Sequence, residues 1–296
     1  MSNHKNVKYR FRTHQFRVSI QLLITLCCLY QSAHSHSDIT QSIERLTQEI
    51  MHDSDNAVLY FQRAELYRRQ GKWSASENDF ALAEQYGYNK QTLKFSQAQL
   101  LIDAGRSSAA LPYLNELLRI NPNFTKALIL RAKIPERDTH DAISDLDRSI
   151  ALLKLPSPDL YIDRAKLQIK SGSKFETMIT GLTQGIDRLG PLASLVGYGV
   201  DQCESKGEFR QGLSMMNMLP TRIKEQANWQ ARYGKFYYNL RDTEKSRTHF
   251  LIALKAIEKL SASRRNSRAI LKLKKEIQSF LQSSDYSQQN INQKDL

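Results

Sequence analysis

The chain has 296 residues, which is enough for one long domain or two. Hydrophobic residues make up 41% and charged residues 25%, a balance typical of a folded protein and too apolar for a disordered one. Only 12 glycines and 7 prolines are present, which disfavours collagen-like chains, linker-rich chains and turn-rich sheet folds. The formal charge of +13 points to an anionic partner only if the excess lies on the folded surface.

Residues 1–35 have the composition of a secretory signal peptide. Five basic residues and no acidic residue lie in residues 1–17, and residues 18–30 form an apolar run with three polar interruptions. Small residues then stand at Ala33 and Ser35, the two positions that a signal peptidase reads. Because the run is shorter than the ~20 residues that span a bilayer, we predict cleavage near Ser35 and a periplasmic or secreted protein. The alternative is an uncleaved segment that anchors the chain in the membrane.

Cleavage would leave Cys203 as the one cysteine of the mature chain, since Cys27 and Cys28 lie in the apolar run. A single thiol cannot form an internal disulfide, so packing alone must stabilise the fold in an oxidising compartment. Cys203 falls on the apolar face of an expected helix, and we predict that it is buried and inert.

The rest of the chain repeats with a period close to 34 residues. Copies aligned on a shared, mostly small residue start at spacings of 34, 34, 33, 35 and 34 residues. A period held over six copies is a strong signal for a solenoid, in which stacked units bury a core that no single unit could bury. The copies are 57–90, 91–124, 125–157, 158–192, 193–226 and 227–260.

The first copy predicts a hairpin of two helices, over Ala57–Gln70 and Lys72–Ala83. Gly71 ends the first helix at little steric cost. Ala64 has almost no side chain and lets the second helix approach closely, while Tyr67 and Phe80 fill the space on either side.

This arrangement of small residues, large residues and a closing proline such as Pro122 resembles the tetratricopeptide repeat (TPR) family, in an exported, bacterial-type form. The resemblance covers residues 57–260. It implies an all-α solenoid of about six helix hairpins and a binding scaffold with no catalytic activity.

Two stretches depart from the pattern. Pro135 lies in the expected first helix of the third copy and predicts an early helix end there. Residues 181–199 contain five glycines, of which Gly181 and Gly185 stand where bulky and small core residues are usual, and this predicts either a bend or a loosely packed middle.

Helices outside the repeats are expected to cap both ends. Residues 36–56 carry apolar residues at helical spacing, and residues 261–282 combine an apolar stripe with a basic face. Residues 283–296 are rich in Ser, Gln and Asn and are predicted to be disordered. The apolar positions are Ile39, Ile43, Leu46 and Ile50 in the first cap and Ile270, Leu273, Ile277 and Phe280 in the second, and the basic face holds Arg264, Arg268, Lys272 and Lys275.

The basic excess is concentrated in two segments. Residues 1–35 hold five basic residues and no acidic ones, and residues 255–275 hold eight basic residues and one acidic residue. The intervening residues 36–254 carry a net charge of only +3. Nucleic acid is therefore not an expected partner.

No catalytic chemistry is visible in the sequence. The histidines of the mature chain are His36, His52, His140 and His249, and none lies at metal-ligand spacing from another. Glycine-rich phosphate loops, Gly-x-Ser-x-Gly and Cys-x-x-Cys are all missing from the sequence. We predict no enzyme activity, catalytic residue, metal, cofactor or small-molecule substrate.

The resemblance implies that the first helix of each repeat lines a concave groove. Apolar residues there would supply contact area to an extended peptide or a helix, and basic residues would orient it. The Lys and Asn of the family's carboxylate clamp are replaced by Phe61 and Glu65 in the first copy, so chaperone tails are not expected ligands. The alternative is that the groove residues pack against neighbouring helices. The predicted groove residues are Phe61, Arg68, Phe95, Gln99, Ile129, Lys133, Ile162 and Lys166, with Lys235 and Tyr238 at the matching positions of the last copy.

Two functions follow. The first is a scaffold in the cell envelope that binds a protein or peptide partner in its groove. The second is a surface-association protein whose basic terminal helix, with Arg264, Arg268, Lys272 and Lys275, rests on anionic lipid or polymer.

Overall fold

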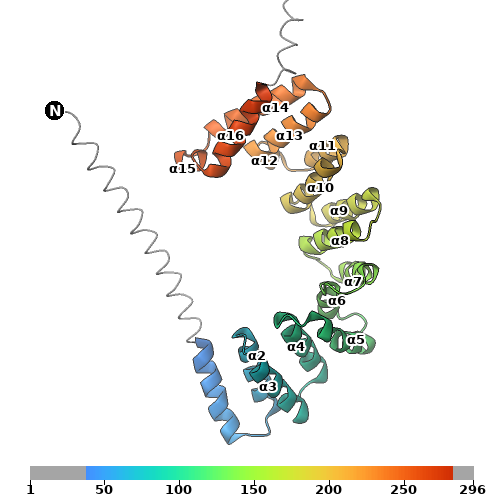
Figure 1. The fold of residues 1–296 in the computed structure, drawn as a ribbon, viewed down its shortest axis with the longest axis vertical. Helices are drawn as coiled ribbons and strands as arrows, with labels where there is room; N and C mark the ends of the chain where they lie inside the picture. Colours follow the sequence, from blue (N-terminus) through green and yellow to red (C-terminus); the bar gives the residue numbers. More distant parts are fainter. Residues whose placement is uncertain (1–37, 283–296) are drawn as a thin grey trace, which may run out of the picture. The chain divides into compact units, whose positions relative to one another are not determined.

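The computed structural model describes residues 38–282, and all regular secondary structure in that range is helical (Figure 1). The predicted all-α fold is therefore confirmed. The chain divides after Arg137 into an N-terminal and a C-terminal compact unit. The predicted signal peptide and the predicted disordered tail lie outside the described residues. Between residues 38 and 282, no helix has both the length and the apolarity needed to cross a bilayer.

The N-terminal unit contains a leading helix, two helix hairpins and the first helix of the third copy. This last helix ends at Ala132, and Pro135 follows three residues later, which confirms the predicted early end. The helices are residues 38–52, α2 (Ala57–Arg69), α3 (Trp73–Gln85), α4 (Lys90–Asp103), the 3₁₀ helix η1 (Ser107–Ala110) continuing into α5 (Leu111–Ile120), and α6 (Thr125–Ala132).

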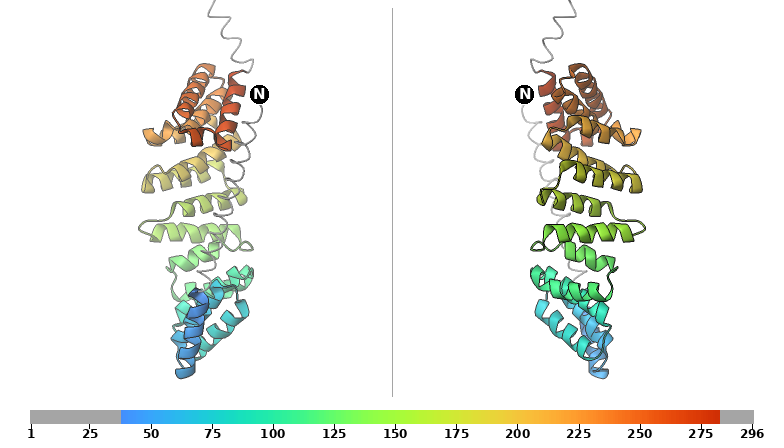
Figure 2. Two further views of the ribbon diagram at one scale, coloured as in Figure 1. Left: turned by 90° about the vertical axis from the view of Figure 1, so that its left-hand side faces the viewer. Right: turned by 90° about the vertical axis from the view of Figure 1, so that its right-hand side faces the viewer.

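The C-terminal unit contains the second helix of the third copy, three further hairpins and a terminal helix. The hairpins α8–α9 and α10–α11 lie in successive layers (Figure 2). The helices are α7 (Thr139–Leu152), α8 (Pro158–Lys170), α9 (Phe175–Leu189), α10 (Ala193–Lys206), α11 (Phe209–Asn217), α12 (Thr221–Lys224), α13 (Ala227–Asn239), α14 (Thr243–Glu258), α15 (Ala262–Arg265) and α16 (Arg268–Leu281).

The two helices of a hairpin cross at the small residue that the repeat predicts. In the first copy Ala64 is fully buried, and the Ser76 hydroxyl of the second helix donates a hydrogen bond of 2.8 Å to its carbonyl oxygen. In the last copy Ser246 donates a bond of 2.7 Å to the carbonyl oxygen of Gly234 in the same way. The serine lies twelve residues after the small residue in both cases. The predicted close approach at Ala64 is therefore confirmed.

The turn between the helices of a hairpin requires a left-handed residue. Gly71 adopts φ +72° two residues after the end of α2, as predicted, and Lys72 donates its backbone N–H to the Tyr67 carbonyl oxygen at 2.9 Å. In the last copy this position holds Arg241, with φ 62°, which is the one positive-φ residue other than glycine among those described. The last hairpin therefore carries backbone strain that glycine avoids in the first.

Residues 181–199 lie in the regular helices α9 and α10 and in the connection 190–192 between them, and the predicted loose packing is wrong. Gly185 in α9 lies against the Tyr161 ring of α8, and a Cβ atom there would approach the ring Cγ to 2.8 Å. Gly199 in α10 is similarly close to Met215 of α11. These glycines are fully packed, because each admits a large side chain from the partner helix.

A matched pair of glycine substitutions tests this packing. Gly185→Ala should lower the free energy of unfolding by about 1–2 kcal/mol, because overpacking costs about 1–3 kcal/mol and exceeds the helix-propensity gain. Gly197 in α10 has no side-chain atom closer than 3.8 Å to a built Cβ. Gly197→Ala should instead raise the free energy of unfolding by about 0.5–1 kcal/mol. Urea denaturation measures both changes in the free energy of unfolding, and equal effects of the two substitutions would contradict the tight packing of Gly185.

Helices at both ends bury apolar faces as predicted. In the leading helix, Leu46 is 2% exposed and Ile50 joins the core cluster of Phe80. In α16, Ile277 is buried and the Phe280 ring stacks on Phe250 at 5.1 Å. The predicted single helix over 261–282 is in fact two, because Ser267 interrupts it and accepts a hydrogen bond from the first turn of α16.

Candidate functional site

The two predicted groove phenylalanines take part in core packing. Phe61 is half-buried and stacks face to face on Tyr88, with ring centroids 4.2 Å apart and an interplanar angle of 10°. Phe95 is half-buried and tilts against Phe124 at 5.3 Å. Each ring therefore offers a partner only the part of its surface that its aromatic neighbour leaves open.

The predicted groove arginine is engaged within the N-terminal unit. The Nη2 atom of Arg68 lies 2.9 Å from the Glu65 carboxylate, and its Nη1 atom donates to the carboxylate of Asp103 in the next copy. Burial alone would lower the pKa of Arg68, but these two carboxylates outweigh that effect and the pKa is raised. Two carboxylates on one guanidinium leave it little capacity to orient an anionic ligand.

The other predicted groove residues divide between the units. Gln99 and Ile129 are half-buried in the N-terminal unit, where Lys133 is exposed. Ile162 and Lys166 belong to the C-terminal unit, and the Lys166 ammonium lies 3.1 Å from the Asp163 carboxylate.

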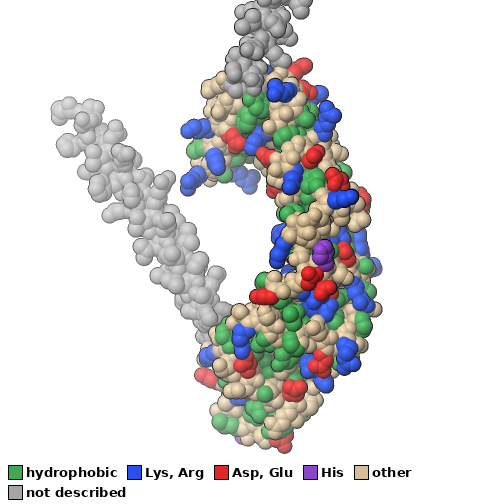
Figure 3. Space-filling model, turned by 45° about the vertical axis from the view of Figure 1, so that its right-hand side comes forward, with side chains coloured by type: hydrophobic (Ala, Val, Ile, Leu, Met, Phe, Trp, Pro, Cys, Tyr) green, Lys and Arg blue, Asp and Glu red, His purple; other side chains and the backbone are tan. Residues whose placement is uncertain are grey.

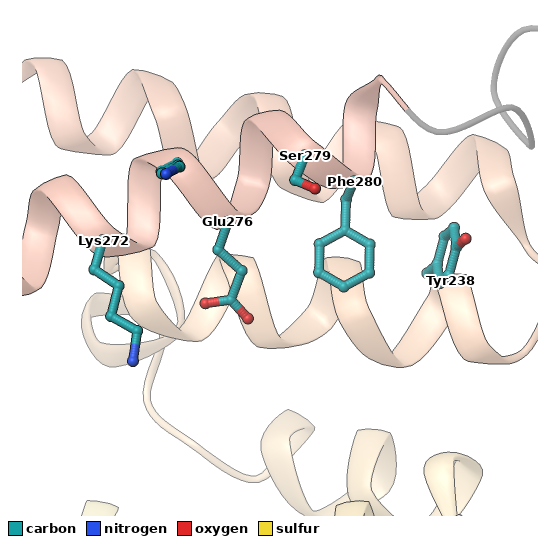
Figure 4. Close-up of a pocket in the computed structure, with 6 residues that line it drawn as sticks. Tyr238, Lys272, Glu276, Ser279 and Phe280 are labelled. Carbon is teal, nitrogen blue, oxygen red and sulfur yellow. The ribbon is translucent and has the colours of Figure 1, made fainter.

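A pocket of about 480 Å³ lies on the C-terminal unit, between α13 and α16. Its apolar wall is formed by Tyr238 and Phe280, whose rings meet edge to face with centroids 5.1 Å apart. Figure 4 shows Lys272, Glu276 and Phe280 projecting from α16 to the side on which the Tyr238 ring lies. We call this the C-terminal pocket, and it is lined by Tyr238, Lys272, Lys275, Glu276, Ser279 and Phe280.

Glu276 carries the one carboxylate that lines the C-terminal pocket, and it pairs with a lysine that does not line the pocket. The Lys235 ammonium of α13 lies 3.1 Å from Glu276 and 3.2 Å from Glu204 of α10. Burial alone would lower the pKa of Lys235, but the two carboxylates raise it, so the ammonium form is retained. Glu276 is thereby already paired with an ammonium group.

The two lysines of the C-terminal pocket have no such partner. Lys272 and Lys275 are exposed, and neither forms an ion pair with any residue between 38 and 282. Figure 3 shows Lys and Arg side chains projecting at the end of the unit where α15 lies. The pocket therefore presents an apolar wall beneath unpaired positive charge.

The C-terminal pocket joins two features that the sequence presents separately. Tyr238 is a predicted groove position of the last copy, while Lys272 and Lys275 belong to the predicted basic face. Arg264 and Arg268 are exposed but do not line the pocket, and Arg264 lies on the separate helix α15. Sequence reasoning missed Glu276 and Ser279. Their spacing of four and seven residues from Lys272 places them on one face of a helix, which was the available signal.

Cys203 and His249 lie in the repeats of the C-terminal unit, outside the lining of this pocket. Cys203 is fully buried, as predicted, and burial raises the pKa of its thiol to about 11, so the reactive thiolate is scarce.

His249 lies between Tyr233 and Tyr237, with ring centroids at 4.9 and 5.3 Å. Its Nδ1 atom is 2.8 Å from Oε1 of Gln230. Burial lowers the pKa of His249. Within residues 38–282, no three potential ligands lie together in a way that could hold a metal ion.

The lowered pKa of His249 predicts acid sensitivity. Because the folded state resists protonation and the unfolded state does not, the unfolded state binds more protons once the pH falls below about 6.5. The free energy of unfolding should therefore decrease from pH 7.5 to pH 5.5, and His249→Gln should reduce that decrease. Urea denaturation at both pH values measures it. His52→Gln, at an exposed position of the leading helix, is the control and should leave the pH dependence unchanged.

No family model matches this sequence, and no curated protein matches it. Solved structures do. The C-terminal part of a TPR repeat-containing protein from Cytophaga hutchinsonii aligns over 80% of this chain and 94% of its own, with a TM-score of 0.61 at 10% identity. A tetratricopeptide repeat protein from Parabacteroides merdae aligns over 82% of this chain and 94% of its own, with a TM-score of 0.50 at 19% identity. At these identities the likeness shows a shared fold.

Proposed function

We propose that this chain, which has the fold of the tetratricopeptide repeat proteins, is a non-enzymatic scaffold that binds a protein partner through the C-terminal pocket. The partner segment is acidic and carries a large apolar side chain. The observation that carries the proposal is that Lys272 and Lys275, which form no ion pair with residues 38–282, line the pocket together with the aromatic rings of Tyr238 and Phe280.

The physical chemistry of the pocket fits such a segment. A volume of about 480 Å³ is within the usual range of roughly 300–1,000 Å³ for ligand pockets, and it accommodates a side chain with its flanking backbone. The rings of Tyr238 and Phe280 supply apolar contact. The two ammonium groups attract carboxylates, and such complementarity acts mainly on specificity and association rate. The ion pair with Lys235 offsets part of the opposing charge of Glu276.

The N-terminal unit is a weaker candidate for the same function. Phe61 and Phe95 keep part of their surface exposed, but the first is stacked on Tyr88 and the second packs on Phe124. Arg68 is held by two carboxylates. A peptide in the predicted groove would therefore gain less area and less charge there than at the C-terminal pocket.

A fluorescence polarisation experiment tests the proposal. The probe is a labelled decapeptide in which Glu and Asp flank a single Phe, and a peptide with Lys in place of the acidic residues is the probe control. Lys272→Glu combined with Lys275→Glu should weaken binding at least about tenfold, because attraction becomes repulsion. Arg247→Glu combined with Lys255→Glu is the matched control on the exposed face of α14 and should have little effect.

The same variants separate this function from its alternative. The alternative predicts that the protein floats with vesicles of anionic phosphatidylglycerol and that the Lys272→Glu and Lys275→Glu double variant does not. If that result is found and the acidic peptide also fails to bind, the basic face associates with lipid and the peptide proposal is wrong. Equal peptide binding by both double variants would also contradict it.

We also propose that the scaffold acts outside the cytoplasmic membrane, in the cell envelope. The support for this is the sequence of residues 1–35 alone. N-terminal sequencing of the protein from envelope extracts should begin close to His36. A mature protein that still begins at Met1 would contradict cleavage and favour the anchored alternative.

A further inference from the structure

We propose that a second pocket, between α8 and α9 of the C-terminal unit, binds an uncharged primary amide, as carried by the side chain of Asn or Gln in a partner segment. The proposal is independent of the C-terminal pocket, with which it shares no residue. The α8–α9 pocket has a volume of about 340 Å³, and Arg164, Gln168, Glu176, Thr177 and Thr180 are among its lining residues.

The first observation is a buried donor without an acceptor. Arg164 is only 7% exposed, and its guanidinium is held on two sides. Its Nη1 atom donates to the Asp147 carboxylate at 2.8 Å, and its Nη2 atom donates to the Gly181 carbonyl oxygen at 2.8 Å. The remaining Nε–H group is buried and has no hydrogen-bond partner among the described residues. Buried polar groups in proteins are nearly always paired, so this one points to an absent acceptor.

The second observation is a buried acceptor without a donor, one helical turn away. Gln168 is 8% exposed, and its Oε1 atom is also buried and unpartnered among residues 38–282. Residues four apart on a helix lie on the same face, and both Arg164 and Gln168 line the pocket. Thr177 and Thr180 on α9 add hydroxyl groups to the opposite wall.

The charges around the pocket select a neutral ligand. The positive charge of Arg164 is already balanced by Asp147, and Glu176 on the lining repels a carboxylate. A carboxylate also has no proton to donate to Gln168, and an ammonium group has no lone pair to accept from Arg164. A primary amide has both, because its oxygen accepts and its nitrogen donates.

Gly181 fixes the geometry of this site. A Cβ atom at Gly181 would lie 2.8 Å from Nη2 of Arg164, so any other residue would displace the guanidinium. The glycine thus leaves its own carbonyl oxygen accessible to Nη2.

Proton–nitrogen correlation NMR on the full chain tests the proposal, since it detects arginine Nε–H groups directly. The cross-peak of Arg164 is assigned by its loss in Arg164→Lys. We expect N-acetyl-asparagine N-methylamide to shift this cross-peak in a saturable manner. The isosteric aspartate compound should bind at least tenfold more weakly.

Gln168→Leu removes the acceptor but keeps the side-chain size, and it should weaken asparagine binding at least tenfold. Its melting curve by circular dichroism confirms that it folds. Gln85→Leu, at an exposed position of α3, is the matched control and should bind as the unmodified chain does. A cross-peak that does not shift, that shifts equally with the aspartate compound, or that still shifts in Gln168→Leu would overturn the proposal and leave ordered water as the partner of both groups.

Discussion

The close approach of two helices at a residue without a long side chain is the contact on which each hairpin depends. At Ala64 and at Gly234 the backbones come near enough for a serine of the second helix to bond the carbonyl oxygen of the first. A bulkier residue would separate the helices, and the aromatic side chains beside the crossing would no longer fill the space between them. Phe80 and Phe250, both fully buried, occupy that space in the first and last copies.

This crossing also determines which faces of the helices carry charged side chains. Because small and apolar residues face the partner helix, charged residues occupy the remaining faces, where they pair between consecutive copies. Arg68 of the first copy bonds Asp103 of the second. In the C-terminal unit, Lys235 of the last copy bonds Glu204 of the copy before and Glu276 of the terminal helix.

The C-terminal pocket lies on the last helix of the described range. Within residues 38–282 no carboxylate pairs with Lys272 or Lys275. The terminal helix α16 therefore has two faces with different roles. Its apolar stripe covers the last repeat, and its basic face leaves unpaired charge beside the exposed parts of Phe280 and Tyr238.

The glycines of the C-terminal unit show how a local pattern can mislead. Gly181 and Gly185 lower helix propensity, and on sequence they indicate a weak segment. In the structure, Arg164 fills the space above the first and Tyr161 fills the space above the second. Propensity describes one helix alone, whereas the stability of these helices comes from side chains that a neighbouring helix supplies.

The candidate sites were predictable only in part for the same reason. Phe61 was identified as a groove residue from its place in the repeat, but its stacking on Tyr88 depends on where the loop before α4 returns. Lys272 was identified as basic surface, but its proximity to Tyr238 requires α16 to pack on α13. Gln168 carries no sequence signal at all.

The sequence by itself determined the all-helical repeat, its period, the crossing at Ala64 and the apolar faces of both end helices, because these follow from spacing along a helix. Only the tertiary structure decided which side chains remain unpaired. Asp103, Glu276 and Asp147 reach Arg68, Lys235 and Arg164 from other helices, and such pairing consumes some charges while it leaves others free to bind.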